Sequence, residues 1–245
     1  MDFKSVDRKQ YVRGMFDGIA HRYDLMNRLM TGGLDQRWRR RVVQMANPRP
    51  GRRMLDLATG TGDLARALLD AGGDSIRVIG LDFSVDMIRA GAGKFQQAQS
   101  DGRHRVVIGD IESMGFGENQ FDAVTIGFGV RNLGNIPQGL AEMYRVLAPG
   151  GRLVILEAVT PKYAWLARCI RLYTDLLLPR LGRLISGDAH AYQYLPWSVE
   201  HFPSRGDVLD LLGNIGFTGQ RYDDCLLGVA TIFSATKPLS SGPVS

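Results

Sequence analysis

The chain has 245 residues, of which 44% are hydrophobic and 22% are charged. This length is enough for one α/β domain with a full core, and the composition is ordinary for a globular protein rather than a disordered one. The net charge of +5 at pH 7 comes mostly from arginine. Aromatic residues are not interleaved with the basic ones as in a nucleic-acid module, so no nucleic-acid partner is expected.

The cysteines and the apolar runs indicate the cellular setting. Cys169 and Cys225 stand far apart in the sequence, so neither a disulfide framework nor a metal site is expected. No signal peptide is recognised, and no apolar run approaches the roughly 18 residues that a membrane span requires. We therefore expect a cytoplasmic protein with reduced thiols.

Residues 1–50 precede the first predicted strand and are expected to form a helical cap beside the sheet. Tyr11 and Met15 follow a helical spacing, which two adjacent glycines interrupt. Trp38 and Val42 resume the spacing until two prolines end it. This is too much ordered-looking sequence for a disordered tail.

From residue 52 on, predicted strands alternate with predicted helices. Ser84 is the expected N-cap of the second helix. The alternation predicts an α/β fold in which helices cover both faces of a parallel sheet, with a ligand crevice at the carboxyl ends of the strands. The strands are expected at 53–58, 77–82, 105–109, 121–128 and 152–159, and the helices near 63–71, 84–98, 136–147 and 205–214.

The last third of the chain departs from this alternation. Residues 160–203 are expected to form a helical insertion, and the apolar stripe within 160–186 has two interpretations. It packs against the edge of the sheet, or it rests with its arginines on a membrane surface. The runs 217–226 and 229–236 predict a closing antiparallel hairpin, and a disordered tail is expected at 239–245.

The stretch 53–65 carries the strongest functional signal. An apolar strand ends in the sequence TGTGD, in which Gly60 and Gly62 permit a tight turn and the close approach of a ligand. The next strand ends in Asp82, where a carboxylate can accept hydrogen bonds from both hydroxyls of a ribose. Together these features predict a nucleotide-like cofactor.

Two classes of cofactor fit this loop. The spacing from Gly60 to Ala65 matches a dinucleotide fingerprint, which makes an NAD-dependent oxidoreductase the alternative from another functional class. Asp110 and Ile111 follow the third strand and supply an acid and an apolar residue for an adenine amino group and ring. Together with the helices before the loop and the closing hairpin, they favour S-adenosyl-L-methionine.

Further motifs carry a resemblance to the menaquinone and ubiquinone C-methyltransferase family. They follow the order of the family signatures, and the resemblance covers residues 11 to about 237. It implies a class I S-adenosylmethionine-dependent methyltransferase fold with a Rossmann-like sheet, and a methyltransferase domain at 51–238. The motifs are YDLMN at 23–27 with Thr31-Gly32 and Trp38-Arg39, LDLATGTGD at 55–63, TIGFGVRN at 125–132, YRVL at 144–147 with PGG at 149–151 and Glu157, and Tyr192, Tyr194, Leu195, Ser198 and Phe202-Pro203.

The resemblance implies methylation of a ring carbon on a polyprenylated quinol. The reaction would convert demethylmenaquinol to menaquinol, or act on 2-methoxy-6-polyprenyl-benzoquinol in ubiquinone biosynthesis. A catalytically inactive lipid-binding relative is a third interpretation. The resemblance also places cofactor contacts at Thr61, Asp82, Asp110 and Ile111. Such a substrate brings the protein to the inner face of the membrane, and the sequence leaves open whether it forms a homo-oligomer.

The catalytic candidates follow from the chemistry of a quinol ring. A phenol-like hydroxyl has a pKa of about 10, and a base that removes its proton enriches the ring carbon in electrons. Asp35, His190 and Tyr192 are the candidate bases, with Arg131 to stabilise the phenolate oxygen. The family usually carries histidine at the position of Asp35 and serine at that of Thr31. Asp35 must therefore replace that histidine as a base, or the role lies elsewhere.

The sequence also suggests how four other polar or aromatic side chains are placed. Glu157 is expected to be a buried partner at a strand end, and Asp56 binds either the glycine loop or the ligand. Tyr192 and Tyr194 alternate, so they cannot both face the site if their segment is extended.

Overall fold

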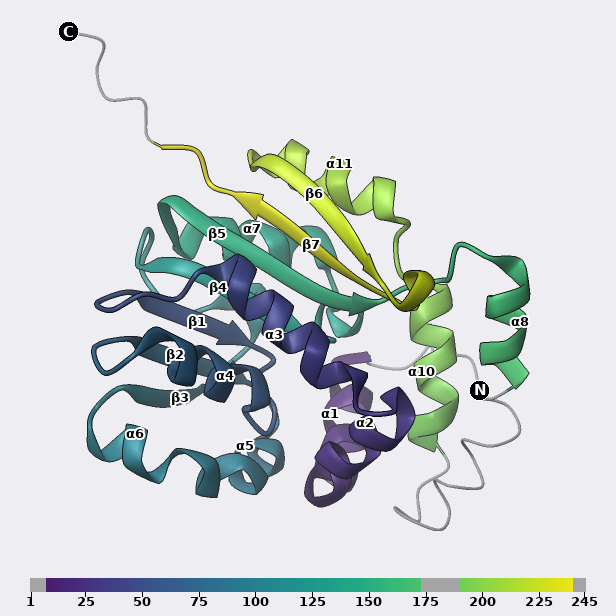
Figure 1. The fold of residues 1–245 in the computed structure, drawn as a ribbon, viewed down its shortest axis with the longest axis horizontal. Coiled ribbons are helices and arrows are strands. Elements are labelled where there is room, and N and C mark those ends of the chain that lie inside the picture. The colour runs from purple at the N-terminus through teal and green to yellow at the C-terminus, as the bar shows by residue number, and fades with distance from the viewer. Residues whose placement is uncertain (1–7, 173–189, 240–245) are drawn as a thin grey trace, which may run out of the picture.

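A seven-stranded mixed sheet forms the centre of the computed structural model, which describes residues 8–172 and 190–239 (Figure 1). The strands lie in the order β3-β2-β1-β4-β5-β7-β6. Strands β1 to β5 pair in parallel, and β7 pairs antiparallel with both β5 and β6. The predicted α/β sheet with a closing hairpin is confirmed. The strands are β1 Arg53–Leu57, β2 Arg77–Asp82, β3 His104–Ile108, β4 Phe121–Gly127, β5 Leu147–Ala158, β6 Thr218–Cys225 and β7 Ala230–Thr236.

Helices cover both faces of this sheet, as the alternation of strand β5 shows. Leu153 and Ile155 join a core with α7 and α11, whereas Val154 and Leu156 point to the other face and join a core with α3 and α4. The described helices are α1 Arg8–Ile19, α2 Tyr23–Thr31, α3 Leu34–Ala46, α4 Asp63–Gly72, α5 Val85–Gly91, α6 Gln96–Ser100, α7 Ile136–Val146, α8 Ala164–Leu172, α10 His190–Glu200 and α11 Arg205–Ile215.

The first three helices occupy two different places. Helix α3 packs on the sheet beside α4, where Trp38 and Leu68 belong to one core. Helices α1 and α2 lie beyond the carboxyl ends of the parallel strands, next to α10 (Figure 1). By its packing α3 therefore belongs to the layer that covers the sheet. The boundary between a cap at 1–50 and a methyltransferase domain at 51–238 stays a prediction.

One predicted helix is interrupted where it meets the glycine loop. A single helix at 84–98 was expected, but α5 ends at Gly91, and a short 3-10 segment and α6 follow. A Cβ atom on Gly91 would lie 2.2 Å from the carbonyl oxygen of Thr61, so only glycine fits this approach. The prediction of one continuous helix is wrong: the chain tightens into a 3-10 segment at Ala92–Phe95, which follows Gly91 and contains Gly93, and glycine is a weak helix former. Strand β5 also begins earlier than expected, at Leu147.

The predicted insertion at 160–203 contains helices α8 and α10. Residues 173–189 of the insertion, and 240–245 of the expected tail, lie outside the described residues. Helix α10 packs on α1 and α2 through a small core that includes Val12, Met26 and Tyr194. On α8 the side chains of Trp165 and Leu172 are more than half exposed.

His104 is a buried ionisable residue at the start of β3. Its ring stacks on that of Phe95 with 3.9 Å between the ring centroids. Neither ring nitrogen has a hydrogen-bond partner within the described part of the chain. Burial lowers the pKa of His104 to about 4, because the protonated ring would be poorly solvated there.

We predict that His104 makes the fold acid-sensitive. Between pH 6.5 and pH 4 the unfolded chain binds a proton at His104 that the folded chain does not, so stability falls as the pH falls. Asp56, whose pKa burial raises to about 6, acts in the opposite direction over this range. The test therefore compares the wild type with His104→Leu by urea unfolding at about pH 7.5 and about pH 5. The difference in unfolding free energy should change by about 2 kcal/mol in favour of the variant at the lower pH. A pH-independent difference would contradict this.

Candidate active site

The glycine loop between β1 and α4 is fixed by a buried acid beneath it. Asp56 is 1% exposed, and it accepts hydrogen bonds of 2.7 Å from the hydroxyls of Thr59 and Thr125. Of the two interpretations of Asp56, the structure therefore supports the anchor of the loop. Gly60 and Gly62 both have positive φ, as the turn requires.

The two glycines of the loop have different surroundings. Gly60 lines a cleft of about 500 Å³ at the carboxyl ends of the strands. Gly62 is not among the residues lining it, and a Cβ at Gly62 would lie 2.3 Å from the ring of Phe95. Gly62 therefore serves the packing of the loop on Phe95. The cleft does bring together five predicted cofactor-binding residues, namely Gly60, Thr61, Asp82, Asp110 and Ile111.

Asp82 lies at the end of β2 and joins two adjacent segments of the cleft. One carboxylate oxygen accepts a hydrogen bond from the backbone N–H of Gly60 at 2.7 Å, and the other accepts one from Ser84 at 2.9 Å. Burial raises the pKa of Asp82. Each carboxylate oxygen can accept a second hydrogen bond, so Asp82 can bind a ribose while it holds the loop. The Ser84 hydroxyl accepts from Met87 N–H, which confirms the predicted N-cap.

Asp110 and Ile111 follow β3 at the other end of the cleft. The Asp110 carboxylate accepts a hydrogen bond from the backbone of Glu112 at 2.9 Å and one from Lys9 Nζ at 2.7 Å. Burial opposes the charge of Asp110, but the hydrogen bonds from Lys9 and the Glu112 backbone, together with the charge of Lys9, lower the pKa overall. Ile111 is 6% exposed and offers an apolar surface beside this carboxylate. An acid next to an apolar side chain fits an adenine amino group and ring.

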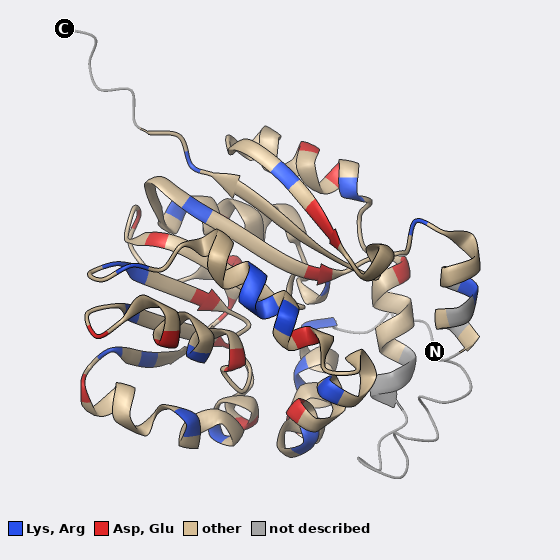
Figure 2. Ribbon diagram, viewed as in Figure 1, with Lys and Arg blue, Asp and Glu red and all other residues tan. Residues whose placement is uncertain are grey.

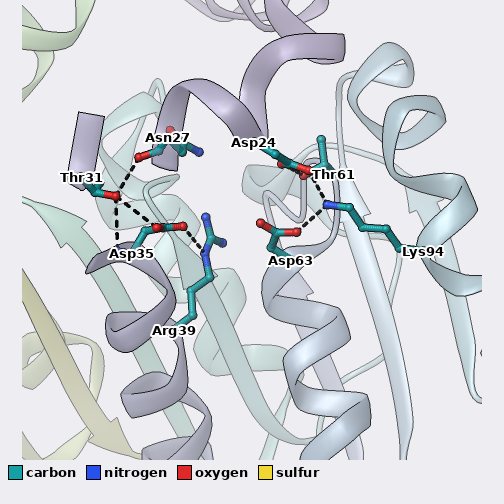
Figure 3. A network of polar contacts seen from close by, with 8 residues as sticks. All are labelled: Asp24, Asn27, Thr31, Asp35, Arg39, Thr61, Asp63 and Lys94. Carbon is teal, nitrogen blue, oxygen red and sulfur yellow. Dashed lines mark hydrogen bonds and ion pairs between the residues drawn. The ribbon is translucent and has the colours of Figure 1, made fainter. Parts of the chain in front are cut away.

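Helix α2 is joined to the glycine loop by an ionic network that the sequence did not reveal (Figure 3). The Thr61 hydroxyl donates to one oxygen of Asp24, and Lys94 Nζ lies 2.6 Å from the other. Lys94 also pairs with Asp63 at the start of α4. Asp24 lies within the YDLMN motif, but nothing in the motif names Thr61 or Lys94 as its partners. The network holds α2 against the loop.

A second, apolar cavity adjoins the cleft. It has a volume of about 440 Å³ and is lined mainly by α1, α2, α8, α10 and the ends of β5 and β7. Phe16, Tyr23 and Phe128 line both spaces, so the cleft and the cavity meet at these three rings. A group bound in the cleft can therefore face a molecule held in the cavity.

Asp35 and Arg131, two of the four predicted catalytic residues, line this apolar cavity. Asp35 is 2% exposed and accepts a hydrogen bond of 3.1 Å from the Thr31 hydroxyl. Its other oxygen lies 3.5 Å from Arg39 Nε (Figure 3). A carboxylate in such surroundings can accept a proton from a bound hydroxyl.

Arg131 is held by Glu157, which is fully buried at the end of β5. Glu157 accepts hydrogen bonds from the side chain and the backbone N–H of Arg131, which confirms its expected role as a strand-end partner. Burial opposes the charge of Arg131, but the charge and the hydrogen bond of Glu157, with smaller contributions from Tyr23 and Tyr194, together raise the pKa, so the guanidinium stays protonated. Its Nε has no hydrogen-bond partner among the described residues and remains a donor for a ligand.

Phe128 has a left-handed backbone with φ of 59°, which is costly for a bulky residue. Its N–H donates to the Leu156 carbonyl at 2.7 Å, and its own carbonyl accepts from Arg131 Nη1 at 2.7 Å. These bonds hold the ring at the boundary of the cleft and the cavity. The sequence places two glycines beside Phe128 but gives no sign that Phe128 itself takes the strained conformation.

The other two predicted catalytic residues, His190 and Tyr192, belong to α10, but their side chains lie outside the described part of the structure. The segment is helical, so Tyr192 and Tyr194 do not follow the alternation of a strand. Tyr194 lines the apolar cavity, and its hydroxyl donates to Asn132 at 3.1 Å.

Comparison with known proteins agrees with this arrangement. A model of the ubiE/COQ5 methyltransferase family matches residues 4–237. The chain belongs to this family. The ubiquinone/menaquinone biosynthesis C-methyltransferase UbiE of Geotalea daltonii is 39% identical over 96% of this chain and its own full length. The demethylmenaquinone methyltransferase of Thermus thermophilus is 44% identical over 91% of this chain and all of its own.

Solved structures support the fold. The [4+2]-cyclase SpnF is similar over 95% of this chain and 97% of its own, with a TM-score of 0.69 and 17% identity. A SAM-dependent methyltransferase from Aquifex aeolicus is similar over 81% and 88% of the two chains, with a TM-score of 0.59 and 17% identity.

This family member is an S-adenosyl-L-methionine-dependent methyltransferase with a class I Rossmann-like fold, as predicted. The alternative of an NAD-dependent oxidoreductase is not supported. The cleft suits the cofactor, because Asp82 offers acceptors for ribose hydroxyls and Asp110 with Ile111 offers an acid and an apolar face for adenine.

We predict that Asp82→Asn weakens the binding of S-adenosyl-L-methionine by about 10- to 100-fold. The change removes the charge that strengthens the ribose hydrogen bonds, each worth about 1.5–3 kcal/mol, and disturbs the bond to Gly60. Isothermal titration calorimetry measures the effect. Asp86→Asn, on the exposed side of α5, is the matched control and should bind normally. An unchanged dissociation constant in Asp82→Asn would remove this residue from the site.

Proposed function

We propose that this chain methylates a ring carbon of a polyprenylated quinol, converting demethylmenaquinol to menaquinol. The observation that carries the proposal is the junction of two spaces. A polar cleft with strand-end acids meets an apolar cavity at Phe16, Tyr23 and Phe128. An apolar cavity suits a ring with a prenyl tail. The Asp35 carboxylate and the Arg131 guanidinium that line it can bind the hydroxyl groups of the ring.

The names of the relatives support the quinone class and both acceptors. Proteins from Desulfitobacterium hafniense and Thermus thermophilus are named demethylmenaquinone methyltransferases, and the Geotalea daltonii protein is named for ubiquinone and menaquinone biosynthesis. The second candidate substrate is accordingly 2-methoxy-6-polyprenyl-benzoquinol. Both rings carry an unsubstituted carbon next to a hydroxylated one, so the same site chemistry serves either.

The residues of the cavity supply what an aromatic carbon nucleophile needs. When bound, S-adenosyl-L-methionine would supply an electrophilic methyl group and leave as S-adenosylhomocysteine, and the methylated ring carbon would release its proton to the solvent as the ring regains aromaticity. We assign to Asp35 the acceptance of the quinol hydroxyl proton, which has a pKa of about 10 in water. Arg131, which stays protonated beside Glu157, then stabilises the phenolate oxygen. His190 and Tyr192 remain further candidates for the base.

Positioning supplies a further part of the rate. Two reactants held in line on either side of the three shared rings gain an advantage that reaches about 7–11 kcal/mol in well-oriented systems. The apolar lining also excludes water, which strengthens the charge interactions of Asp35 and Arg131.

The prenyl tail requires an exit from the cavity, and we propose that it leaves toward a membrane surface. Leu166 and Ile170 of α8 line the cavity, while Trp165 on the same helix is 61% exposed. Leu25 and Leu29 of α2 are also about half exposed. In the described part of the chain, none of the helices has the length and apolarity to cross a bilayer. We propose that the exposed apolar side chains of α2 and α8 make a peripheral contact with the inner face of the membrane.

We predict that the purified protein transfers a methyl group from S-adenosyl-L-methionine to reduced demethylmenaquinone with a short prenyl tail. Mass spectrometry should show menaquinone and S-adenosylhomocysteine in equal amounts. The same assay with the benzoquinol tests the second acceptor. Turnover of the benzoquinol alone would select that substrate, and turnover of neither would overturn the proposal.

We predict that Asp35→Asn lowers kcat by about 10²–10⁴-fold, the usual contribution of a general base, while cofactor affinity changes far less because Asp35 does not line the cofactor cleft. Asp35→His should recover part of the rate, since imidazole is also a base. Its activity should fall below about pH 6.5, where the ring becomes protonated. Asp70→Asn, on the exposed face of α4, controls for the removal of a charge. Normal turnover in Asp35→Asn would move the role to another residue.

A further inference from the structure

Arg39 is a basic residue that reaches the cofactor cleft from the layer of helices on the sheet. Trp38 and Val42 of the same helix, α3, are buried in the core. The Arg39 side chain is only 12% exposed, and it lines the cleft together with Gly60 and Asp63. Its position is therefore fixed by the packing of α3 on the sheet.

The guanidinium of Arg39 has unused hydrogen-bonding capacity. Its Nε lies 3.5 Å from Asp35, a distance that marks an ion pair, and it has no hydrogen-bond partner in the described chain (Figure 3). Burial raises the pKa of Asp56, and the charge of Arg39 is among the effects that oppose this. The charge of Arg39 is thus felt at the base of the glycine loop. Within the described residues no hydrogen bond of Arg39 competes with a ligand.

The other basic residues that line the cleft are either paired with acids or partly exposed to solvent. Of the described cleft-lining residues, Lys9, Arg13 and Arg39 are basic. Lys9 pairs with Asp110 and Glu112 at the end that suits adenine, and the Arg13 side chain is about half exposed. Figure 2 shows basic residues (blue) along α3 and acidic residues (red) at strand ends beside them. Arg39 is the described cleft-lining cation that comes from the sheet layer, beside the glycine loop.

We propose that Arg39 binds the carboxylate of the methionine portion of S-adenosyl-L-methionine. Asp110 and Asp82 suit the adenine and ribose ends, so the amino-acid end extends along Gly60 and Asp63 toward Arg39. A guanidinium can form two parallel hydrogen bonds with a carboxylate, which gives both strength and orientation. The inference rests on the cofactor of the family and not on the identity of the quinol.

The test compares two cofactors that differ by one carboxylate. Calorimetry measures the binding of S-adenosyl-L-methionine and of its decarboxylated analogue, which keeps the sulfonium and the amine, to the wild type and to Arg39→Gln. We expect the variant to lose about 10- to 100-fold in affinity for S-adenosyl-L-methionine. Affinity for the analogue should stay unchanged or rise, because the variant removes a positive charge from beside a cation.

Matched variants separate binding from a structural role. Arg39→Lys should restore part of the affinity, since it keeps the charge but not the paired donors. Arg40→Gln, which changes an exposed arginine of the same helix that does not line the cleft, should bind both compounds like the wild type. A variant damaged only in folding would lose affinity for both compounds equally. Equal losses, or no loss in Arg39→Gln, would overturn the proposal, while failure of the quinol assay alone would leave it standing.

Discussion

The site depends on two buried carboxylates that hold the glycine loop by its backbone and hydroxyl groups. Asp56 binds Thr59 and Thr125 from below, and Asp82 binds Gly60 from the neighbouring strand. A buried charge is costly unless hydrogen-bonded, and the hydrogen bonds from the loop partly offset the burial that raises the pKa of each acid. The loop in turn directs Thr61 into the cleft and starts α4. The same hydrogen bonds therefore stabilise the loop and set the geometry of the binding site.

The N-terminal helices complete the site through contacts with this framework. Lys9 reaches Asp110, and Asp24 reaches both Thr61 and Lys94. Single exposed ion pairs contribute little, but contacts spaced along α1 and α2 fix the orientation of both helices. This orientation brings Phe16 and Tyr23 to the boundary with the apolar cavity. Helices α1 and α2 form one wall of the cavity because these contacts hold them over the strand ends.

Local sequence signals predicted the strands, the glycine turn and the acids at the strand ends. Features that depend on contacts between distant segments could not be predicted. The glycine turn and the acids Asp82 and Asp110 are visible because each directly follows an apolar strand. The close approach of Gly91 to the Thr61 backbone could not be seen, since it joins segments that are distant in sequence. The same holds for the strained backbone of Phe128, which hydrogen bonds to Leu156 and Arg131 keep in place. The periodicity of apolar residues indicates which face of a helix or strand is buried, but not which other segment packs against that face.

Thr31 and Asp35, where the resemblance leads us to expect serine and histidine, form one unit with Arg39. Thr31 donates to Asp35, and Asp35 pairs with Arg39, so the three side chains lie at intervals of four residues in a continuous chain of contacts (Figure 3). A neutral histidine in place of Asp35 would leave the Arg39 guanidinium without its anionic partner. Asp35 lines the apolar cavity, and Arg39 lines the cleft. In the proposed role of Asp35 as a base, its change of charge would alter the field at Arg39, so this buried pair would connect the two halves of the site electrostatically.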